Sequence, residues 1–180
     1  MVATVPVAVQ DESFLFQVYA ETRRDEVAAW GWAPAQQEAF LRMQFQLQQR
    51  SYAMQFPGAG HQVILHEGVP AGQVMVLRLP DSIRLIDMAV LPDFQGKGLG
   101  TAVLQGLQAE ARQAGKPLQL SVRKENMGAR RLYERLGFIT TAQSETQYAM
   151  EWRPERGDAD VDAAHFSPAP ADPVSRPSRS

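Results

Sequence analysis

Residues 91–104, LPDFQGKGLGTAVL, decide the fold class expected of this chain. An apolar, strand-like run precedes the glycines at positions 96, 98 and 100, and apolar residues with helical spacing follow them. The segment is therefore predicted to be a strand, a glycine loop and a helix that begins near Gly98. Glycines let backbone amides approach a ligand without a clashing β-carbon, and the N-terminus of a helix favours an anion. The pattern predicts a loop that holds a phosphate group.

Two common phosphate-binding loops do not fit this spacing. The dinucleotide fingerprint requires a glycine where Thr101 stands, counting from Gly96. The Walker loop places its lysine after the second glycine, whereas Lys97 lies between two glycines. What remains is a glutamine, two residues, a glycine, one residue and a glycine, formed by Gln95, Gly98 and Gly100. The spacing argues against both nucleotide-binding classes.

Hydrophobic periodicity indicates an α/β domain around this loop. Helices are predicted at residues 11–30, 34–56, 98–114 and 126–138, and strands at residues 5–9, 61–65, 71–79, 84–91, 118–122 and 147–152. Asp11 is a candidate N-cap for the first helix, and Pro34 suits the first turn of the second. Phe40, Met43 and Leu47 lie on one face of that second helix, and we expect them to pack in the core rather than bind a ligand.

Length and composition restrict the classes of function. A chain of 180 residues fits one domain, here residues 1–152, and the proline-, serine- and alanine-rich residues 153–180 are predicted to be a disordered tail. A net charge of −2 argues against bulk binding to nucleic acid or an acidic membrane. Without cysteine there is no disulfide and no thiol nucleophile, and with three histidines no metal site is expected. No basic leader or long apolar segment occurs, so we expect a cytoplasmic protein.

Two blocks within residues 85–138 carry a family resemblance. The segment MAVLPDFQGKGLGTAVL (residues 88–104) resembles the acyl-coenzyme-A-binding loop of the GNAT superfamily of N-acetyltransferases. The segment NMGARRLYERLGF (residues 126–138) resembles the other signature of that superfamily, an asparagine, a short helix and a glycine followed by an aromatic residue. The resemblance implies the GNAT acyl-CoA N-acyltransferase fold, an α/β fold whose mixed, mostly antiparallel sheet is flanked by helices. It also implies direct transfer of an acetyl group from acetyl-CoA to a primary amine of a small molecule or peptide.

The resemblance also implies which residues contact coenzyme A. The pyrophosphate would lie on the backbone of Gln95, Gly96, Lys97, Gly98, Leu99, Gly100 and Thr101. The backbone of Met88, Ala89 and Val90 would hold the pantetheine arm and the thioester carbonyl, and Asn126 would lie beside the arm. Lys97 fits a solvated surface lysine equally well, and Asn126 also suits the N-cap of its helix, a role compatible with the first.

Acid–base chemistry requires a proton donor for the leaving thiolate and an acceptor for the amine proton. Tyr133 occupies the tyrosine position of the family and would be the general acid, although its ring also fits core packing with the hydroxyl at the rim. Asp87, the lone carboxylate in an apolar strand, is the first candidate for the base; alternatively it is tied to a neighbour such as Arg84. The carboxylates of Glu21, Glu26 and Glu125 are weaker candidates.

The acceptor is less defined by the sequence. Residues 19–32 are expected to form one wall of its site, with Arg23 and Arg24 able to hold a carboxylate and Trp30 and Trp32 offering flat apolar surface. The same residues also fit a solvated turn. A non-catalytic acyl-CoA-binding regulatory module of the same fold is the alternative function, and Tyr133 favours the enzyme. The sequence leaves monomer and homodimer both open.

Overall fold

The computed structural model of the protein describes residues 1–155. Its strands are β1 (Val2–Pro6), β2 (Gly60–His66), β3 (Val69–Arg78), β4 (Ile83–Val90), β5 (Leu118–Arg123), β6 (Ile139–Gln143) and β7 (Gln147–Trp152). Its helices are α1 (Glu12–Ala28), α2 (Pro34–Gln55), α3 (Leu99–Ala114) and α4 (Met127–Arg135), with short 3-10 turns at Val9–Asp11 and Pro92–Phe94. Most of the tail predicted at residues 153–180 lies outside the described residues.

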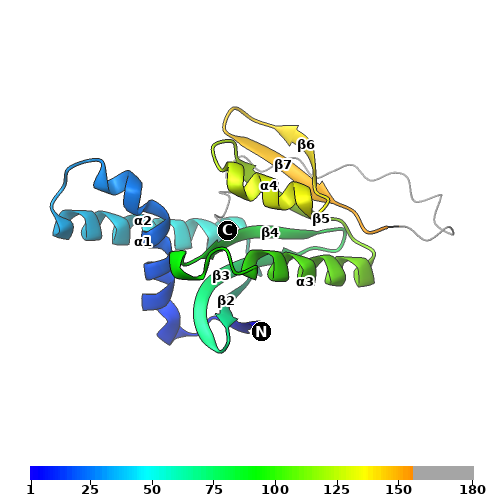
Figure 1. Cartoon of the computed structure of the whole chain (residues 1–180), viewed down its shortest axis with the longest axis horizontal. Helices are drawn as coiled ribbons and strands as arrows, with labels where there is room; N and C mark the ends of the chain where they lie inside the picture. Colours follow the sequence, from blue (N-terminus) through cyan, green and yellow to red (C-terminus); the bar gives the residue numbers. More distant parts are fainter. Residues whose placement is uncertain (156–180) are drawn as a thin grey trace.

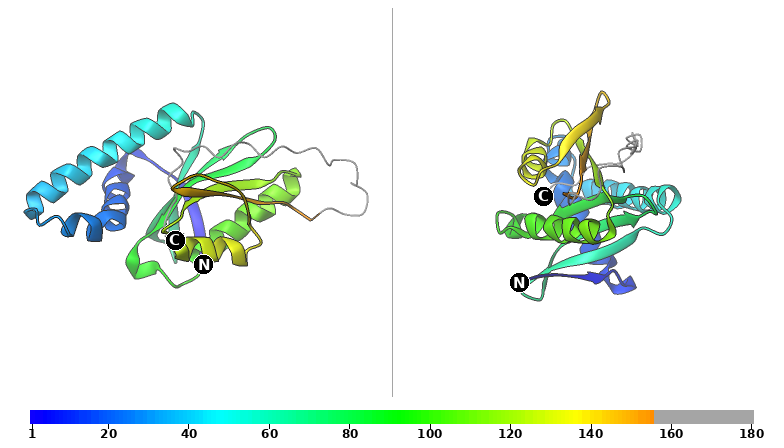
Figure 2. Two further views of the ribbon diagram at one scale, coloured as in Figure 1. Left: turned by 90° about the horizontal axis from the view of Figure 1, so that it is seen from above. Right: turned by 90° about the vertical axis from the view of Figure 1, so that its right-hand side faces the viewer.

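The strands form one sheet in the order β1-β2-β3-β4-β5-β7-β6. Neighbouring strands are antiparallel except for the parallel pair β4 and β5, which confirms the predicted mixed, mostly antiparallel α/β fold. Helices α3 and α4 cover one face of the sheet, and α1 and α2 approach the other (Figure 1). Figure 2 shows α1 and α2 as a hairpin that projects beyond the sheet.

The main core lies between the sheet and the helices α3 and α4. Met88, Leu104 and Leu118 are fully buried there, and α4 adds Leu132 and Tyr133. Two smaller apolar clusters lie on the opposite face, one between α1 and α2 and one where α2 meets β3 and β4. The second face is therefore packed only in part, which leaves room for a cavity beneath the helical hairpin.

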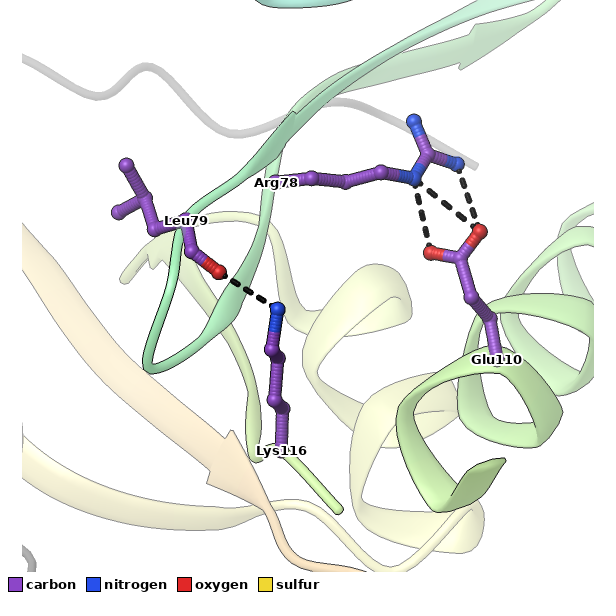
Figure 3. Close-up of polar contacts among 4 residues, drawn as sticks. All are labelled: Arg78, Leu79, Glu110 and Lys116. Carbon is purple, nitrogen blue, oxygen red and sulfur yellow. Dashed lines mark hydrogen bonds and ion pairs between the residues drawn. The ribbon is translucent and has the colours of Figure 1, made fainter. Parts of the chain in front are cut away.

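Polar contacts connect the C-terminal part of α3 with the turn of the β3–β4 hairpin (Figure 3). The Nε atom of Arg78 donates to Glu110 Oε2 at 2.9 Å, and Lys116 Nζ donates to the carbonyl oxygen of Leu79 at 2.9 Å. Arg78 is the last residue of β3 and Leu79 follows it, whereas Glu110 lies in the C-terminal part of α3 and Lys116 follows that helix. The contacts hold the helix along the sheet, so its N-terminus stays beside the C-terminal end of β4.

Two expectations about the N-terminal half and the sheet edge are corrected. The first strand covers Val2–Pro6 rather than residues 5–9, because its antiparallel pairing with β2 ends at Pro6. Asp11 is the N-cap residue of α1, as predicted, although its carboxylate accepts the N–H of Ala8 at 2.8 Å and not an N–H of that helix. Strand β6 was not predicted. Every residue of this strand is exposed, so its sequence lacks the alternation of apolar and polar side chains that marks a half-buried strand.

The buried face of α2 differs from the prediction. Met43 and Leu47 are 50% and 51% exposed, whereas Leu41, Phe45 and Tyr52 are buried. Because α2 has apolar side chains on two faces, periodicity alone did not reveal which one meets the protein. None of the described helices is long and apolar enough to cross a membrane.

Candidate functional site

Strands β4 and β5 separate soon after they meet. Their parallel pairing covers only Ile83 with Leu118 and Arg84 with Gln119, although β4 continues to Val90 and β5 to Arg123. The later residues of β4 therefore present backbone N–H and C=O groups at an edge that β5 leaves unpaired. An extended chain of alternating donors and acceptors can add to such an edge as a further strand would.

The glycine loop begins where this open edge ends. Gly96 and Gly98 have φ of +77° and +79°, a conformation that residues with a β-carbon rarely adopt. Gly98 is the N-cap of α3, which confirms the predicted helix start, and Gly100 is buried in the first turn. A β-carbon at either of the two left-handed glycines would meet no atom within 4 Å. The backbone angle therefore requires glycine, and the space beside these residues is open.

Side chains of the loop fix its path rather than fill this space. Gln95 Nε2 donates to the carbonyl oxygen of Val90 at 3.0 Å, which ties the loop to the end of β4. Leu99 is buried in the core, so only its backbone is available to a ligand. Lys97 is exposed, with Nζ 5.6 Å from the ring centroid of Phe94. An exposed Lys97 fits both alternatives, a contact to the pyrophosphate and a solvated surface lysine.

A cavity of about 440 Å³ opens on the sheet face beneath α1 and α2. It is lined by apolar residues of both helices and of β3, by polar residues of β2, β3 and β4, and by the connection from β5 to α4. Asp87, Ala89 and Asn126, three residues of the predicted site, contribute to its lining. The cavity therefore reaches from the helical hairpin to the gap between β4 and β5.

A β-bulge directs Asp87 into this cavity. Met75 of β3 pairs with Asp87, and the next residue, Val76, pairs with Leu85, so Ile86 is an extra residue in β4. Before the bulge Leu85 packs in the main core, and after it Met88 does. Strict alternation from Leu85 would have placed Asp87 in that core. With the bulge, the carboxylate lies on the opposite face, under α1 and α2.

Asp87 belongs to a hydrogen-bonded chain across three strands. Gln73 Nε2 donates to Asp87 Oδ2 at 3.0 Å, and Gln73 Oε1 lies 2.8 Å from His61 Nε2. Burial raises the pKa of Asp87 to about 6, although hydrogen bonds from Gln73 and the Met88 backbone and the charge of Arg23 act in the opposite direction. Burial lowers the pKa of His61, against the effect of its bond to Gln73. A neutral His61 that donates from Nε2 turns the amide NH₂ of Gln73 toward the carboxylate.

Asp87 is thus tied to a neighbour, but that neighbour is Gln73 and not Arg84. The guanidinium of Arg84 lies 6.0 Å from the ring centroid of Phe56. Sequence reasoning missed Gln73, because nothing in the local pattern of β3 distinguishes an inward glutamine from a surface one. His61 is one of the three histidines that were considered only in the argument against a metal site, and its strand pairing was needed to connect it with Asp87.

Tyr133 is buried in the main core. It is 1% exposed and its ring centroid lies 5.7 Å from that of Phe138, so the ring packs in the core as one alternative expected. Tyr133 is not among the residues that line the cavity. Asn126 Oδ1 accepts the N–H of Ala129 at 3.2 Å, which confirms the N-cap. Tyr133 follows Asn126 by seven residues and therefore lies on the same face of α4.

Of the four side chains predicted for the acceptor wall, Arg23 lines the cavity and Arg24, Trp30 and Trp32 do not. Arg23 lines the cavity, whereas Arg24 does not and pairs with Glu21. Trp30 and Trp32 also lie outside the cavity lining and pack against Phe40 with ring centroids 5.3 and 5.5 Å away. Among the other candidate carboxylates, Glu26 and Glu125 line the cavity and Glu21 does not.

Comparison with protein families finds one match that covers most of the chain. The model that describes the Acetyltransferase (GNAT) family matches residues 15–138. This range includes α1, α2, the bulged strand β4, the glycine loop and α4, and thus all residues that line the cavity.

Individual proteins match shorter segments. The L-amino acid N-acyltransferase MnaT of Escherichia coli K12 is 44% identical over 55 residues, which cover 30% of this chain and 32% of that protein. The ribosomal protein bS18-alanine N-acetyltransferase of the same organism is 46% identical over 59 residues, 32% of this chain and 40% of that one. The chain thus matches about a third of the length of these curated relatives.

A solved structure shares the fold over a larger part of the chain. The PaiA N-acetyltransferase of Thermoplasma acidophilum, crystallised with coenzyme A, superposes with a TM-score of 0.59 at 14% identity. The superposition covers 85% of this chain and 99% of that protein. The likeness shows a common arrangement of strands and helices.

Proposed function

Because this chain belongs to the Acetyltransferase (GNAT) family, we propose that it transfers an acetyl group from acetyl-coenzyme A directly to a primary amine. One observation carries the proposal: the unpaired edge of β4 connects the glycine loop with the cavity that contains Asp87. An anion site, an edge for an extended arm and a carboxylate thus follow one another along one strand. The related proteins named as N-acyltransferases support the same reaction.

In this proposal the backbone binds acetyl-coenzyme A. The amides from Gln95 to Thr101 and the N-terminus of α3 would receive the pyrophosphate, since the positive φ angles of Gly96 and Gly98 and the open space beside them suit an anion. The edge formed by Met88, Ala89 and Val90 would hold the pantetheine arm, with Asn126 across the gap. Lys97 would add positive charge at the mouth of the loop.

Acid–base groups of the chain would then move two protons. Asp87, with its pKa near 6, is ionised at neutral pH and accepts a proton from the acceptor ammonium, directly or through water. The amine nitrogen forms a bond to the thioester carbon, the carbon–sulfur bond breaks, and backbone N–H groups of β4 stabilise the negative charge on the carbonyl oxygen. The leaving thiolate takes a proton from the hydroxyl of Tyr133, the second proton of the amine nitrogen returns to the tyrosinate through water, and Asp87 releases its proton to solvent. The products are an N-acetylated amine and coenzyme A.

The reaction proposed here needs no covalent enzyme intermediate, since amine and thioester meet in one cavity. The acceptor is a small-molecule or peptide amine. We place the reaction in the cytoplasm, where acetyl-coenzyme A is made and consumed.

Calorimetric titration with acetyl-coenzyme A, beside ATP and a nicotinamide dinucleotide, tests the proposal first. Selective micromolar binding of acetyl-coenzyme A is expected, followed by release of free thiol when a mixture of primary amines is added. Binding without thiol release from any amine would favour the non-catalytic regulatory module. A preference for either nucleotide would contradict the assignment of the loop.

A further inference from the structure

The cavity contains a guanidinium group that lacks a hydrogen-bond partner. Arg23 extends from α1 into the cavity lining, and its side chain is only 21% exposed. Its guanidinium carbon lies 5.2 Å from the ring centroid of Tyr19. Within residues 1–155 it forms no hydrogen bond, and its ion-pair contact is with Glu26, at 3.9 Å between Nη1 and Oε2. A guanidinium carries several N–H donors in a planar fork, so Arg23 has donors that no acceptor of the described residues uses and that a ligand in the cavity could engage.

Other arginines of the described chain show how this group is usually satisfied. Arg42, Arg78 and Arg130 each donate to a carboxylate within 3.1 Å, on the surface of the protein. Arg123, the second arginine of the cavity lining, is 43% exposed and lies 3.4 Å from Glu125. Arg23 is thus more buried than Arg123 and more loosely paired. A planar anion in the cavity would supply the missing acceptors bidentately.

Arg23 and Asp87 bring opposite charges to the lining of one cavity. Asp87 lines the same space, and the positive charge of Arg23 lowers its pKa, so the two groups interact electrostatically. A ligand with an ammonium near Asp87 and a carboxylate near Arg23 would pair both. Leu15, Val18, Phe45, Tyr52 and Met75 add apolar surface to the wall, beside further polar residues of α1, α2 and the β5–α4 connection. A zwitterion with an apolar side chain matches this distribution.

We infer that the acceptor is a free amino acid with an apolar side chain, and that Arg23 receives its carboxylate. The inference rests on the proposed function, because it takes the amine to be the group that is acetylated. The N-terminus of a longer peptide would bring a neutral amide in place of the carboxylate and leave Arg23 unpaired. A diamine would bring a second positive charge toward it.

Acceptors that differ at one group test the inference. Thiol release is measured with L-leucine, L-methionine and L-phenylalanine, each as the free acid and as its carboxamide, and with a linear diamine. We expect kcat/KM for a free acid to exceed that of its amide by about 10- to 100-fold, the range of a charge-assisted bidentate contact. Arg23→Gln should abolish this preference, mainly by raising KM for the acid. Arg24→Gln, the exposed neighbour, should keep the preference.

A binding measurement separates recognition from chemistry. The protein saturated with coenzyme A is titrated calorimetrically with a free amino acid and with its amide, conditions under which no transfer occurs. The wild type should bind the acid more tightly than the amide, and Arg23→Gln should bind the two alike. An unchanged affinity for acetyl-coenzyme A shows that this variant is folded.

Several outcomes would overturn the inference. These are equal use of acids and amides, a preference for the diamine, no binding or acetylation of any of the acids while acetyl-coenzyme A still binds, or an Arg23→Gln variant that keeps the preference for acids. Failure of the proposed function would look different, because acetyl-coenzyme A would then not bind or no amine would release thiol; in that case the acceptor assignment falls with it.

Discussion

The glycine loop offers a ligand backbone groups, whereas the cavity under α1 and α2 offers it side chains. The loop offers backbone amides, held by positive φ angles at Gly96 and Gly98, while its lysine is exposed and its leucine is buried in the core. The cavity offers side chains such as Asp87, Gln73 and Arg23, which come from three separate elements. A backbone site is altered only by residues that change the backbone path. A side-chain site can be altered by single substitutions without refolding, so one fold can keep its co-substrate while its acceptor changes.

Substitution of Gly98 should have the largest effect, a loss of acetyl-coenzyme A binding at the backbone site. Gly98→Val places a β-branched residue at a φ of +79°, where it is strained by roughly 1–3 kcal/mol, and turns amides away from the anion. Strain and lost charge-assisted hydrogen bonds together should weaken acetyl-coenzyme A binding by about 10³-fold. Calorimetric titration measures this affinity.

Gly106→Ala is the matched control for that variant. Gly106 is exposed in the middle of α3, and a β-carbon there meets nothing within 4 Å, so the affinity should not change. A Gly98→Val protein that binds acetyl-coenzyme A as tightly as this control would show that the loop is not the anion site.

Substitution at Asp87 tests the side-chain site through pH. The wild-type carboxyl has a pKa of about 6, raised from 3.8, so the base is ionised above pH 6 and kcat/KM should fall as the pH drops through that value. Asp87→Asn should lower turnover by roughly several hundred-fold and remove this inflection. Because the folded protein holds the proton more tightly than the unfolded chain, the wild type loses stability as the pH rises from 3.8 to about 6, and the loss is complete above pH 6. Asp87→Asn lacks this carboxyl, so its melting temperature at pH 8 should be no lower than that of the wild type.

Gln73→Leu sharpens the same test. The hydrogen bond from Gln73 lowers the pKa of Asp87, so its removal should move the inflection of the rate profile above pH 6. Glu21→Gln, outside the cavity and paired with Arg24, should leave the profile where it is. If the inflection in the pH profile of kcat/KM persists in Asp87→Asn, the inflection belongs to another titratable group.

Tyr133 combines a structural and a proposed chemical role. Its ring is part of the core, while its role as the acid depends on one hydroxyl. Tyr133→Phe keeps the packing against Phe138 and removes only that group, so turnover should fall on the order of 10²-fold with acetyl-coenzyme A binding nearly intact. Tyr148→Phe, a half-buried tyrosine on β7, is the control and should leave turnover unchanged. Equal rates in the two variants would leave Tyr133 a structural residue.

The same difference explains which parts of the site the sequence could predict. The glycine spacing and the cap at Asn126 are local patterns, so the loop, the start of α3 and the start of α4 could be predicted correctly. The side of the sheet that Asp87 faces depends on the bulge at Ile86, which forms only when β4 pairs with β3. Gln73 and Arg23 acquire a role from neighbours that are distant in the sequence. Periodicity carries no information about such neighbours.

The buried face of helix α2 likewise could not be predicted from periodicity, and substitutions on its exposed face should have the smallest effects of those considered. Its two apolar faces look alike in the sequence, but one carries the buried Leu41 and the other the half-exposed Met43 and Leu47. Met43→Gln and Leu47→Gln should change the free energy of unfolding by less than about 0.5 kcal/mol, whereas Leu41→Ala should cost roughly 2–5 kcal/mol. Urea unfolding measures both. A large loss from either glutamine variant would mean that this face is covered in solution, and a concentration-dependent melting temperature would then identify a second copy of the chain as the cover.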